Sequence, residues 1–368
     1  MDFMLKNIQL TNFRNISNFE DSLAETSNVI IAPNSSGKTN FLESIYYSTL
    51  GNSFKPIQFV NEFIGSERDF AKVLTVWSSN NLEVVISKLN DKFYKKFSVD
   101  RKKIPVSKVI GKYPVLVFAP NSVDLVSGEP SLRRTDLDDY LGLLDKQYQD
   151  NIDRYFNILK NRNALIKVIR ERRSNPAELK YWTTELVKSA SIIYSKRLDF
   201  FNTISDTVKK TVEEMEIFLK DSYYLELSLH YLPNLEVDPL EFSAALMQKF
   251  EENGEKEIAA GKTLYGIHKD DYKFLHGEQN LRYFGSRGQQ RLATFLIKIS
   301  QMTYYFNKYQ TYPLFLIDDL MSELDNTNRK KVAQYLSNQA FQFILTSAEK
   351  MEIPEILLDS SKQLFLGK

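Results

Sequence analysis

The sequence contains no cysteine among its 368 residues. Disulfide bonds, zinc–thiolate sites and thiol nucleophiles are therefore excluded, and the composition fits a protein of the reducing cytoplasm. The chain also lacks an excess of either charge, because 48 Lys and Arg residues face 47 Asp and Glu residues and leave a net charge of +1. Overall charge thus gives no argument for a polyanionic partner, and any basic surface has to be local.

Long hydrophobic runs are missing too. No segment supplies the ~18 apolar residues of a membrane span, and the N-terminal stretch MDFMLKNIQLTNFRN alternates apolar and polar residues, unlike a signal peptide. We therefore expect a soluble cytoplasmic protein with no membrane partner. Histidine is scarce as well, and the three histidines show no metal-ligand spacing, so ordinary packing is the expected role of His268 and His276.

The middle of the chain is predicted to be helical. From Ser131 to about Leu219 apolar residues recur at helical spacing in two stripes. Between the stripes lies RRSNPAE, where Ser174 or Asn175 can cap a helix and Pro176 suits its first turn. We therefore expect two long antiparallel helices here.

Both ends of the chain carry mixed strand and helix signals. The short apolar runs NVII and PVLVF near one end, and YPLFLIDD and AFQFILTSA near the other, predict buried strands. The simplest architecture is one α/β domain built from both chain ends, residues 1–130 and 256–368, with a helical lobe, residues 131–255, inserted between them.

The stretch APNSSGKTNFLESI, which begins at Ala32, has the strand, loop and helix context of a phosphate-binding loop. Its backbone NH groups and the helix N-terminus would hold phosphates. The residues expected to do so are Asn34, Ser35, Ser36 and Gly37. Lys38 would reach the β and γ phosphates of ATP, and the Thr39 hydroxyl would ligate Mg²⁺. The alternative is a chance G-K-T sequence at a strand-to-helix turn.

The usual pattern of this loop opens with glycine, where this chain has Ala32. A methyl group is harmful there only if the residue needs a positive φ or a very close neighbour. The glycine hardest to replace is Gly37, where the backbone approaches the phosphate, and it is present. We therefore expect the loop to bind nucleotide.

Two adjacent carboxylates follow another buried strand, in LFLIDDLMSELD. Asp318 and Asp319 would lie at the C-terminal edge of the sheet, where α/β sheets place their ligands. Asp318 suits the magnesium shell, and Asp319 is positioned to orient or deprotonate water at the γ phosphate. A purely structural pair is the alternative, but burying adjacent acids is costly without a cation, so the metal interpretation is preferred.

A third motif, SRGQQR, starts a further helix. Ser286 is a plausible cap, and Gly288 would allow close approach of another group. Alone, the pattern indicates only a good helix N-terminus. Together with the other two motifs it becomes a candidate second phosphate-binding end.

This set of motifs resembles the ABC-type ATPase heads of the chromosome-maintenance class, and within that class the RecF family of bacterial recombination and repair proteins. The resemblance covers nearly the whole chain. It is carried, in family order and at roughly family spacing, by LTNFRN, PNSSGKTNFLESI, VFAPNSVDLVSGEPSLRR, NRNALIK, GIHKDD, GSRGQQR and LIDDLMSELD. It implies an α/β fold of the ABC-type P-loop ATPase class, with the head assembled from both chain ends and a helical lobe inserted.

The resemblance also implies an ATP-dependent homodimer with nucleotide between the subunits. Ser286, Gly288 and Gln289 of one subunit would contact the ATP whose γ phosphate is held by Lys38 of the other. Arg14 resembles the arginine that lies near the nucleotide in such proteins. Two further residues, Ser322 and Asp325, fall in the loop that crosses the interface.

The implied function is a DNA clamp in recombinational repair and replication. Such a protein would bind DNA at gaps or single-strand/double-strand junctions, help to load recombinase, and work with the mediators RecR and RecO. Slow ATP hydrolysis would act as a conformational switch.

The chain departs from the family pattern in several places. Ala32 and Ser35 replace glycines that RecF-like loops usually carry, and Asn121 and Ser122 stand where acidic residues are usual. Asp319 replaces the glutamate that is common in the wider ABC class, which is a reason to expect slow hydrolysis.

One local basic cluster is evident between Lys88 and Lys112. It holds nine basic residues against two acidic ones, with Phe93, Tyr94 and Phe97 interleaved. A charged strand pair of this kind could follow a phosphate backbone. Half-buried strands that mix lysines and aromatics are an equally good interpretation.

Three other classes of protein were weighed. A transporter ATPase is disfavoured because 280 positions separate Lys38 from Asp318, room for a large insert that compact transport ATPases lack. A small-molecule kinase would leave SRGQQR and SELD without a role. A protein with long coiled coils is disfavoured because each helical arm, at about 43 residues, spans only ~65 Å.

Overall fold

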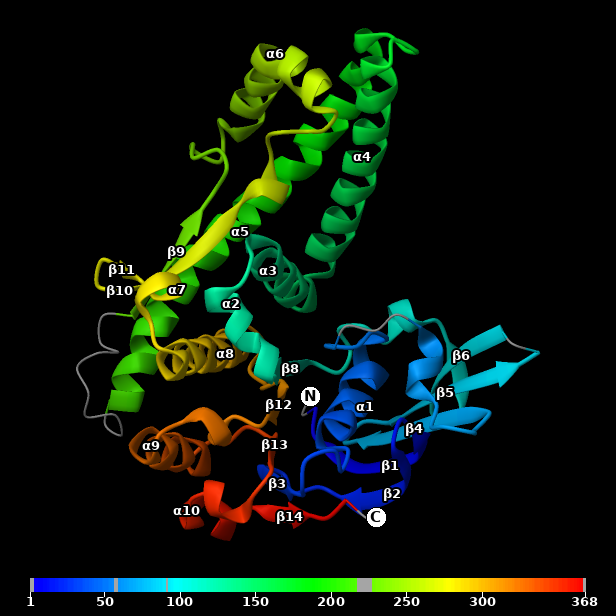
Figure 1. The fold of residues 1–368 in the computed structure, drawn as a ribbon, viewed down its shortest axis with the longest axis vertical. Helices are drawn as coiled ribbons and strands as arrows, with labels where there is room; N and C mark the ends of the chain where they lie inside the picture. Colours follow the sequence, from blue (N-terminus) through cyan, green and yellow to red (C-terminus); the bar gives the residue numbers. More distant parts are fainter. Residues whose placement is uncertain (1–2, 56–58, 91, 217–226, 367–368) are drawn as a thin grey trace. The chain divides into compact units, whose positions relative to one another are not determined.

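The computed structural model describes residues 3–55, 59–90, 92–216 and 227–366. The chain divides into two compact units, which we call the head and the lobe (Figure 1). The head comprises the described residues within Met1–Val123, Lys210–Leu225 and Ser286–Lys368, and the lobe those within Asp124–Lys209 and Glu226–Gly285. Both chain ends, blue and red in Figure 1, thus belong to the head.

These boundaries differ from the expected ones. The lobe begins at Asp124 and ends at Gly285, whereas the sequence pattern placed residues 256–285 in the head. The difference arises because strand β10 (Asp271–His276), which lies in that stretch, pairs with strand β9 (Leu227–Leu232). Both strands therefore fold with the lobe.

A five-stranded parallel sheet forms the centre of the head, in the order β14-β3-β13-β12-β8. Its strands are β3 (Ser27–Ile31), β8 (Val115–Phe118), β12 (Leu314–Asp318), β13 (Phe343–Ser347) and β14 (Lys362–Leu364). Every residue of β12 and β13 is buried, as in a parallel sheet covered on both faces. The predicted strands in NVII, PVLVF, YPLFLIDD and AFQFILTSA are confirmed.

A second, antiparallel sheet of the head has the order β2-β1-β4-β5-β6-β7. Its strands are β1 (Leu5–Phe13), β2 (Ile16–Ser22), β4 (Phe70–Trp77), β5 (Asn81–Leu89), β6 (Lys92–Val99) and β7 (Lys102–Ile104). Buried residues alternate with partly exposed ones along β4 and β5, so one face packs into the core and the other does not.

Helix α1 (Lys38–Leu50) packs against the buried face of that sheet, and its inward residues Phe41, Leu42 and Ile45 are fully buried. The helix ends at Gly51, which adopts the left-handed conformation that glycine favours at helix ends. The remaining helices of the head are α8 (Arg287–Tyr309), α9 (Asn326–Ser337), α10 (Glu355–Asp359) and the 3₁₀ turns η1 (Val60–Phe63), η2 (Val106–Lys108), η3 (Pro120–Val123), η7 (Met321–Glu323) and η8 (Lys350–Glu352).

The lobe is mainly helical. Its helices are α2 (Asp124–Ser127), α3 (Pro130–Leu144), α4 (Lys146–Arg170), α6 (Phe242–Ala260), α7 (Leu281–Phe284), η4 (Pro176–Glu178) and η6 (Ile267–Lys269), with most of α5 (Leu179–Glu216). A three-stranded sheet of β9 (Leu227–Leu232), β10 (Asp271–His276) and β11 (Gln279–Asn280) completes it. In the described part of the chain, no helix combines the length and the apolar character that crossing a bilayer requires.

Helices α4 and α5 form the expected antiparallel pair. Ser189 donates a hydrogen bond to the carbonyl of Asn151, and farther along the pair Arg162 donates to Thr183. Asn175 caps the turn between the helices, as predicted. The first helix is shorter than expected, because Asp145 leaves the helical conformation and caps α4, which separates it from α3.

Buried ion pairs hold the lobe together. Arg197 is fully buried and donates to the carboxylates of Asp138 and Asp270 at 2.8 and 2.7 Å. Arg162 is also buried and pairs with Glu257 at 2.6 Å. These contacts join segments far apart in the sequence, and removal of one partner would leave a buried charge uncompensated.

Candidate nucleotide-binding site

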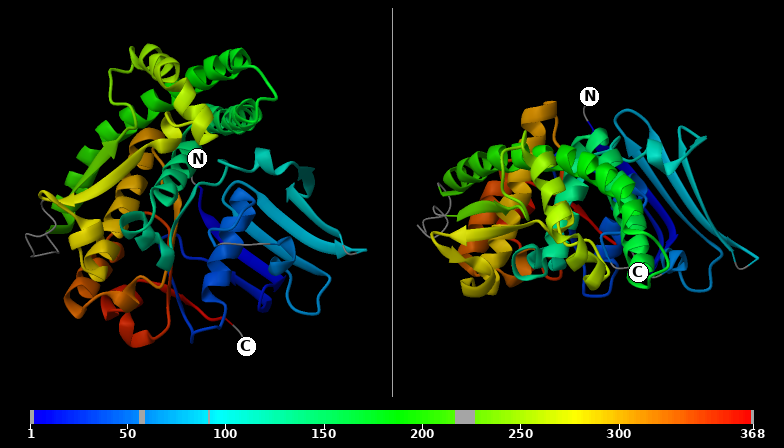
Figure 2. Two further views of the ribbon diagram at one scale, coloured as in Figure 1. Left: turned by 45° about the horizontal axis from the view of Figure 1, so that its top comes forward. Right: turned by 90° about the horizontal axis from the view of Figure 1, so that it is seen from above.

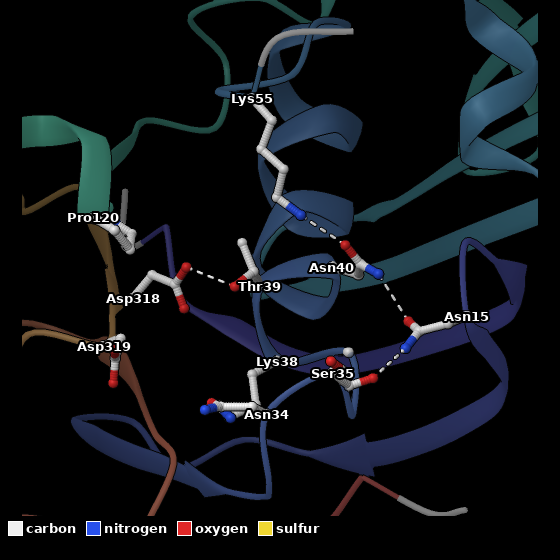
Figure 3. A pocket seen from close by; sticks show the side chains of 11 residues that line it. Asn15, Asn34, Ser35, Lys38, Thr39, Asn40, Lys55, Pro120, Asp318 and Asp319 are labelled. Atoms are coloured by element: carbon white, nitrogen blue, oxygen red, sulfur yellow. Dashed lines mark hydrogen bonds between the residues drawn. The ribbon is translucent and has the colours of Figure 1, made fainter. Parts of the chain in front are cut away.

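A pocket of about 450 Å³ lies at the carboxyl edge of the parallel sheet in the head (Figure 3). It is lined by Asn15, Asn34, Ser35, Gly37, Lys38, Thr39, Asn40, Lys55, Pro120, Asp318 and Asp319. Strands β3 and β12 run parallel in one sheet, so the loop after β3 and the carboxylates after β12 reach the same edge. The pocket therefore gathers most of the residues that the sequence singles out for nucleotide and metal.

Thr39 and Asp318 form the part of the pocket that suits a cation. The Thr39 hydroxyl donates to one oxygen of Asp318 at 2.7 Å, and Thr346 donates to the other at 2.6 Å. Figure 3 shows Thr39 directed toward Asp318. Among the described residues, no group of three or more acidic or histidine side chains is arranged to hold a metal ion. A hydroxyl and one carboxylate are the donor set that fits Mg²⁺, which keeps several waters and takes further oxygens from phosphates.

Asp319 has an unusual conformation and a free oxygen. Its φ is +50°, in the left-handed region, and Arg291 donates hydrogen bonds to its carbonyl and to that of Leu320. Ser322 donates to Oδ2 at 2.8 Å, whereas Oδ1 is buried without a hydrogen-bond partner among the described residues. Burial raises the pKa of this carboxyl group above its usual value. A buried acceptor without a donor, beside the pocket, fits a group that orients water.

The backbone of the loop explains the two departures from glycine. Ala32 is buried without a positive φ, and its NH donates to the carbonyl of Ser347 at 3.3 Å, so a methyl group is tolerated there. Ser35 has φ +67°, a conformation that glycine adopts more easily. Gly37 has φ +102°, and a Cβ there would lie 2.7 Å from Asn15 Oδ1. Gly37 is therefore the position that cannot accept a side chain.

Lys38 is folded back onto its own loop. Its Nζ donates to the carbonyls of Ala32 and Pro33 at 2.5 and 3.0 Å. Burial lowers the pKa of this ammonium group, an effect that the carboxylates of Asp319 and Asp318 oppose. The ammonium group thus lies within the electrostatic reach of the same carboxylates that line the pocket.

Three residues of the pocket lie outside the set expected to bind nucleotide or metal. Lys55 donates to Asn40 Oδ1 at 2.6 Å, Asn40 donates to Asn15 Oδ1 at 2.8 Å, and Asn15 donates to the carbonyl of Ser35 at 3.0 Å (Figure 3). This chain of hydrogen bonds braces the left-handed turn of the loop. Asn15 and Asn40 stand within the motifs LTNFRN and PNSSGKTNFLESI, whereas Lys55 belongs to no motif.

Two of the predicted residues lie beside the pocket and do not line it. Arg14 donates to the buried carboxylate of Glu43 on α1, with an Nη2–Oε1 distance of 2.7 Å. Its neighbour Asn15 lines the pocket instead. Ser36 has a buried Oγ without a hydrogen-bond partner among the described residues, and its NH donates to the carbonyl of Pro33.

The third motif lies at the start of α8 and also does not line this pocket. Ser286 caps the helix, accepting from the NH of Gln289 while the Gln289 side chain accepts from the NH of Ser286. Ser286 is exposed, and a Cβ at Gly288 would find its nearest neighbour 3.9 Å away, at the carbonyl of Glu323. The helix N-terminus is thus open to an outside group.

Comparison with known proteins fits this geometry. The family model described as the RecF/RecN/SMC N terminal domain matches residues 4–362. The DNA replication and repair protein RecF of Bacillus thuringiensis (strain Al Hakam) is 30% identical over 356 residues, which cover 94% of this chain and 92% of that protein. The chain belongs to the RecF family. RecF of Shouchella clausii (strain KSM-K16) is 29% identical, with 94% and 93% of the two chains covered.

Solved structures show the same fold. The recombination mediator protein RecF-ATPrS in the RecFOR pathway superposes with a TM-score of 0.83 at 24% identity, covering 96% of this chain and 95% of its own. An Smc head bound to the C-terminal winged-helix domain of ScpA gives a TM-score of 0.56 at 13% identity, covering 97% and 92%. The ABC-type ATPase head of RecF and SMC proteins predicted from the motifs is therefore confirmed as the fold.

Proposed function

We propose that this RecF-family protein binds ATP with Mg²⁺ in the pocket described above and uses slow hydrolysis to control a two-fold dimer that encloses DNA. As a family member it is an ATPase of DNA replication and repair. The observation that carries the nucleotide part is the meeting of Lys38 and Thr39 with Asp318 and Asp319 at one sheet edge. Neither a transporter ATPase nor a small-molecule kinase is needed to explain this arrangement of residues.

Each pocket residue has a role in this proposal. Lys38 would exchange the carbonyls of Ala32 and Pro33 for phosphate oxygens, while the NH groups around Gly37 hold the phosphates. Thr39 and Asp318 would hold Mg²⁺, which when bound neutralises charge on the phosphate oxygens. The unpartnered oxygen of Asp319 would accept a hydrogen bond from the attacking water and orient it.

The dimer part of the proposal is supported by the uncovered N-terminus of helix α8. Ser286 and Gly288 do not line their own pocket, yet they form an uncovered helix N-terminus, the kind of end that receives phosphate. A two-fold axis would bring this end of one subunit to the nucleotide of the other, with Gln289 beside it. Ser322 and Asp325 would then lie in the loop that crosses the interface, and the role of Arg14 near the nucleotide would be indirect, through Glu43.

DNA and the mediators follow from the relatives. One solved structure with this fold is described as the recombination mediator protein RecF-ATP in the RecFOR pathway. We therefore propose gapped DNA or single-strand/double-strand junctions as the substrate, and RecR and RecO as partners. Loading of recombinase would follow when the dimer holds the junction.

The test is the mass of the protein in solution, measured by light scattering with and without Mg²⁺ and ATP. The wild-type protein should dimerise only with ATP, and Lys38→Ala should remain monomeric. Asp319→Asn keeps the hydrogen bond from Ser322 but lacks the ionised oxygen, so it should dimerise with ATP and release phosphate at least tenfold more slowly than wild type.

ATP should raise the affinity for gapped duplex DNA only in the variants that dimerise. A wild-type protein that stays monomeric with saturating ATP, or that binds gapped DNA equally well without ATP, would contradict the clamp. Turnover as fast as that of a transport ATPase would contradict the role of hydrolysis as a slow switch.

A further inference from the structure

The basic cluster between Lys88 and Lys112 is divided by the pleat of the antiparallel sheet. Residues that pair directly across strands face the same side, and Ser87 pairs with both Tyr94 on β6 and Phe70 on β4. These three residues therefore form one row on the face turned away from α1. Lys88 and Phe93 pair with each other and belong to the opposite face.

This outer face is open. Phe70 and Tyr94 are 43% and 51% exposed, and Leu74 and Val85 in its centre are only partly buried. In the views of Figure 2 no other described segment of the head covers that side of the strands, whereas α1 lies against the inner side. Two exposed aromatic rings on an uncovered sheet face mark an interaction surface rather than a core.

The charge of the outer face is positive. The residues of β4 to β7 that face outward include four lysines, Lys72, Lys92, Lys96 and Lys103, and one carboxylate, Glu83. Glu83 is neutralised by Lys72, at 2.7 Å. Lys96 and Lys103 are exposed and form no ion pair with any described residue. Free lysines around exposed rings complement a polyanion that presents aromatic faces.

We propose that this face binds single-stranded DNA, with unpaired bases stacked on Tyr94 and Phe70 and the phosphates held by Lys96, Lys103 and Lys92. The two rings lie two strand spacings apart, about 10 Å, with the small Ser87 between them. Base stacking on such rings tolerates any sequence. Duplex DNA does not fit the rings, because its bases are stacked on one another.

The inference rests on the proposed function only in taking DNA as the partner, since the surface lies outside the nucleotide pocket. It gives the protein a place for the unpaired strand of a gap. Binding there should need no ATP, because none of the residues proposed to hold the strand lines the nucleotide pocket.

The test measures the anisotropy of a fluorescein-labelled 20-nucleotide oligothymidylate, without ATP, beside an abasic strand of the same length. The variant Phe70→Ser with Tyr94→Ser should bind oligothymidylate at least tenfold more weakly and the abasic strand as well as wild type. Phe93→Ser is the matched control, since this ring is 37% exposed on the opposite face, and it should bind like wild type.

The lysines are tested with the same strands. Lys96→Gln with Lys103→Gln should weaken binding to both strands. The slope of the logarithm of the binding constant against the logarithm of the salt concentration should fall in magnitude by about one unit per lysine. Lys88→Gln with Lys102→Gln removes two charges from the opposite face and should have a smaller effect on the slope.

Photo-crosslinking of a bromodeoxyuridine strand to the wild-type protein should label Tyr94 or Phe70, which keeps the proposal testable if a variant misfolds. Equal losses in the Phe93→Ser control and in the variant with both Phe70→Ser and Tyr94→Ser, or crosslinks confined to other segments, would overturn it. The ring variants should still dimerise with ATP. If the Lys38→Ala variant still dimerises, only the proposed function is contradicted, because the anisotropy assay with single strands contains no ATP.

Discussion

Ser35 strains the backbone of the phosphate-binding loop, yet the loop keeps its shape. Its backbone is left-handed at φ +67°, a conformation that costs a non-glycine residue about 1 kcal/mol. Asn15 holds the Ser35 carbonyl at 3.0 Å, and Asn40 holds Asn15. These side chains stabilise a turn that glycine would adopt unaided, so the loop keeps its shape despite the substitution.

Ser35→Gly should therefore raise the free energy of unfolding of the head by up to about 1 kcal/mol, since glycine relieves the strain but adds freedom to the unfolded chain. Urea unfolding followed by the fluorescence of Trp77 measures it. Ser36→Gly is the control, because Ser36 is not left-handed, and it should give no gain. A loss of stability in Ser35→Gly would show that the serine side chain contributes more than its backbone strain costs.

The buried body of helix α8 and its exposed first residues serve different purposes. Its body is almost wholly buried from Gln290 to Met302, and Arg291 reaches from its first turn to the carbonyls of Asp319 and Leu320. The first residues are open to solvent. The helix thus links the carboxylate end of the pocket to the surface proposed to meet a second subunit.

Gly288→Ala tests that link. A Cβ at this position has 3.9 Å of clearance, and alanine favours a helix over glycine, so the monomer should gain a few tenths to about 1 kcal/mol of stability. Dimerisation with ATP should nevertheless weaken at least tenfold, because the methyl group would stand between the helix end and the phosphate of the partner. Light scattering and urea unfolding give the two readings.

Gly254→Ala is the matched control for that variant. Gly254 lies in α6 of the lobe, and a Cβ there would meet nothing within 4 Å. Its stability should change similarly while ATP-dependent dimerisation stays at the wild-type value. Normal dimerisation in Gly288→Ala would show that the start of α8 does not meet the nucleotide of a partner.

The whole molecule consists of two units that should respond to different ligands. The head contains the nucleotide pocket, and the lobe contains His268, which burial and its surroundings keep neutral by lowering the pKa to about 4. The unfolded chain binds a proton at His268 from about pH 6.5 downward, while the folded lobe does so only near pH 4. The stability of the lobe should therefore fall as the pH is lowered through this range.

The two tryptophans report on the units separately, because Trp77 lies in the head and Trp182 in the lobe. In single-tryptophan variants, Mg²⁺ and ATP should raise the urea midpoint seen by Trp77, and lowering the pH from 7 to 5.5 should cost the unit seen by Trp182 about 1 kcal/mol. His268→Gln should remove this pH effect. An equal acid response in that variant would assign the effect to groups other than His268. Asp270 is not one of them, because burial raises its pKa and acid would then stabilise the folded lobe.

Much of the candidate site could be predicted because it is built from short continuous stretches. The loop from Asn34 to Thr39 follows a strand directly, and Asp318 ends another, so the rule that parallel strands share a carboxyl edge brings them together. Lys55 could not be predicted, because its place in the pocket depends on the path of the chain after α1. The same holds for Asn15, on the turn between two antiparallel strands.

The sequence by itself determined the elements and the chemistry of the loop, since capping, periodicity and residue type act over a few neighbours. Asn175 and Ser286 both stand at the helix ends predicted for them. Only the tertiary structure decided which charges are buried and which side of a sheet is open. Arg162 and Lys96 are both basic residues, yet Arg162 is buried against Glu257 and Lys96 is exposed. Burial depends on contacts between distant segments, which no local pattern records.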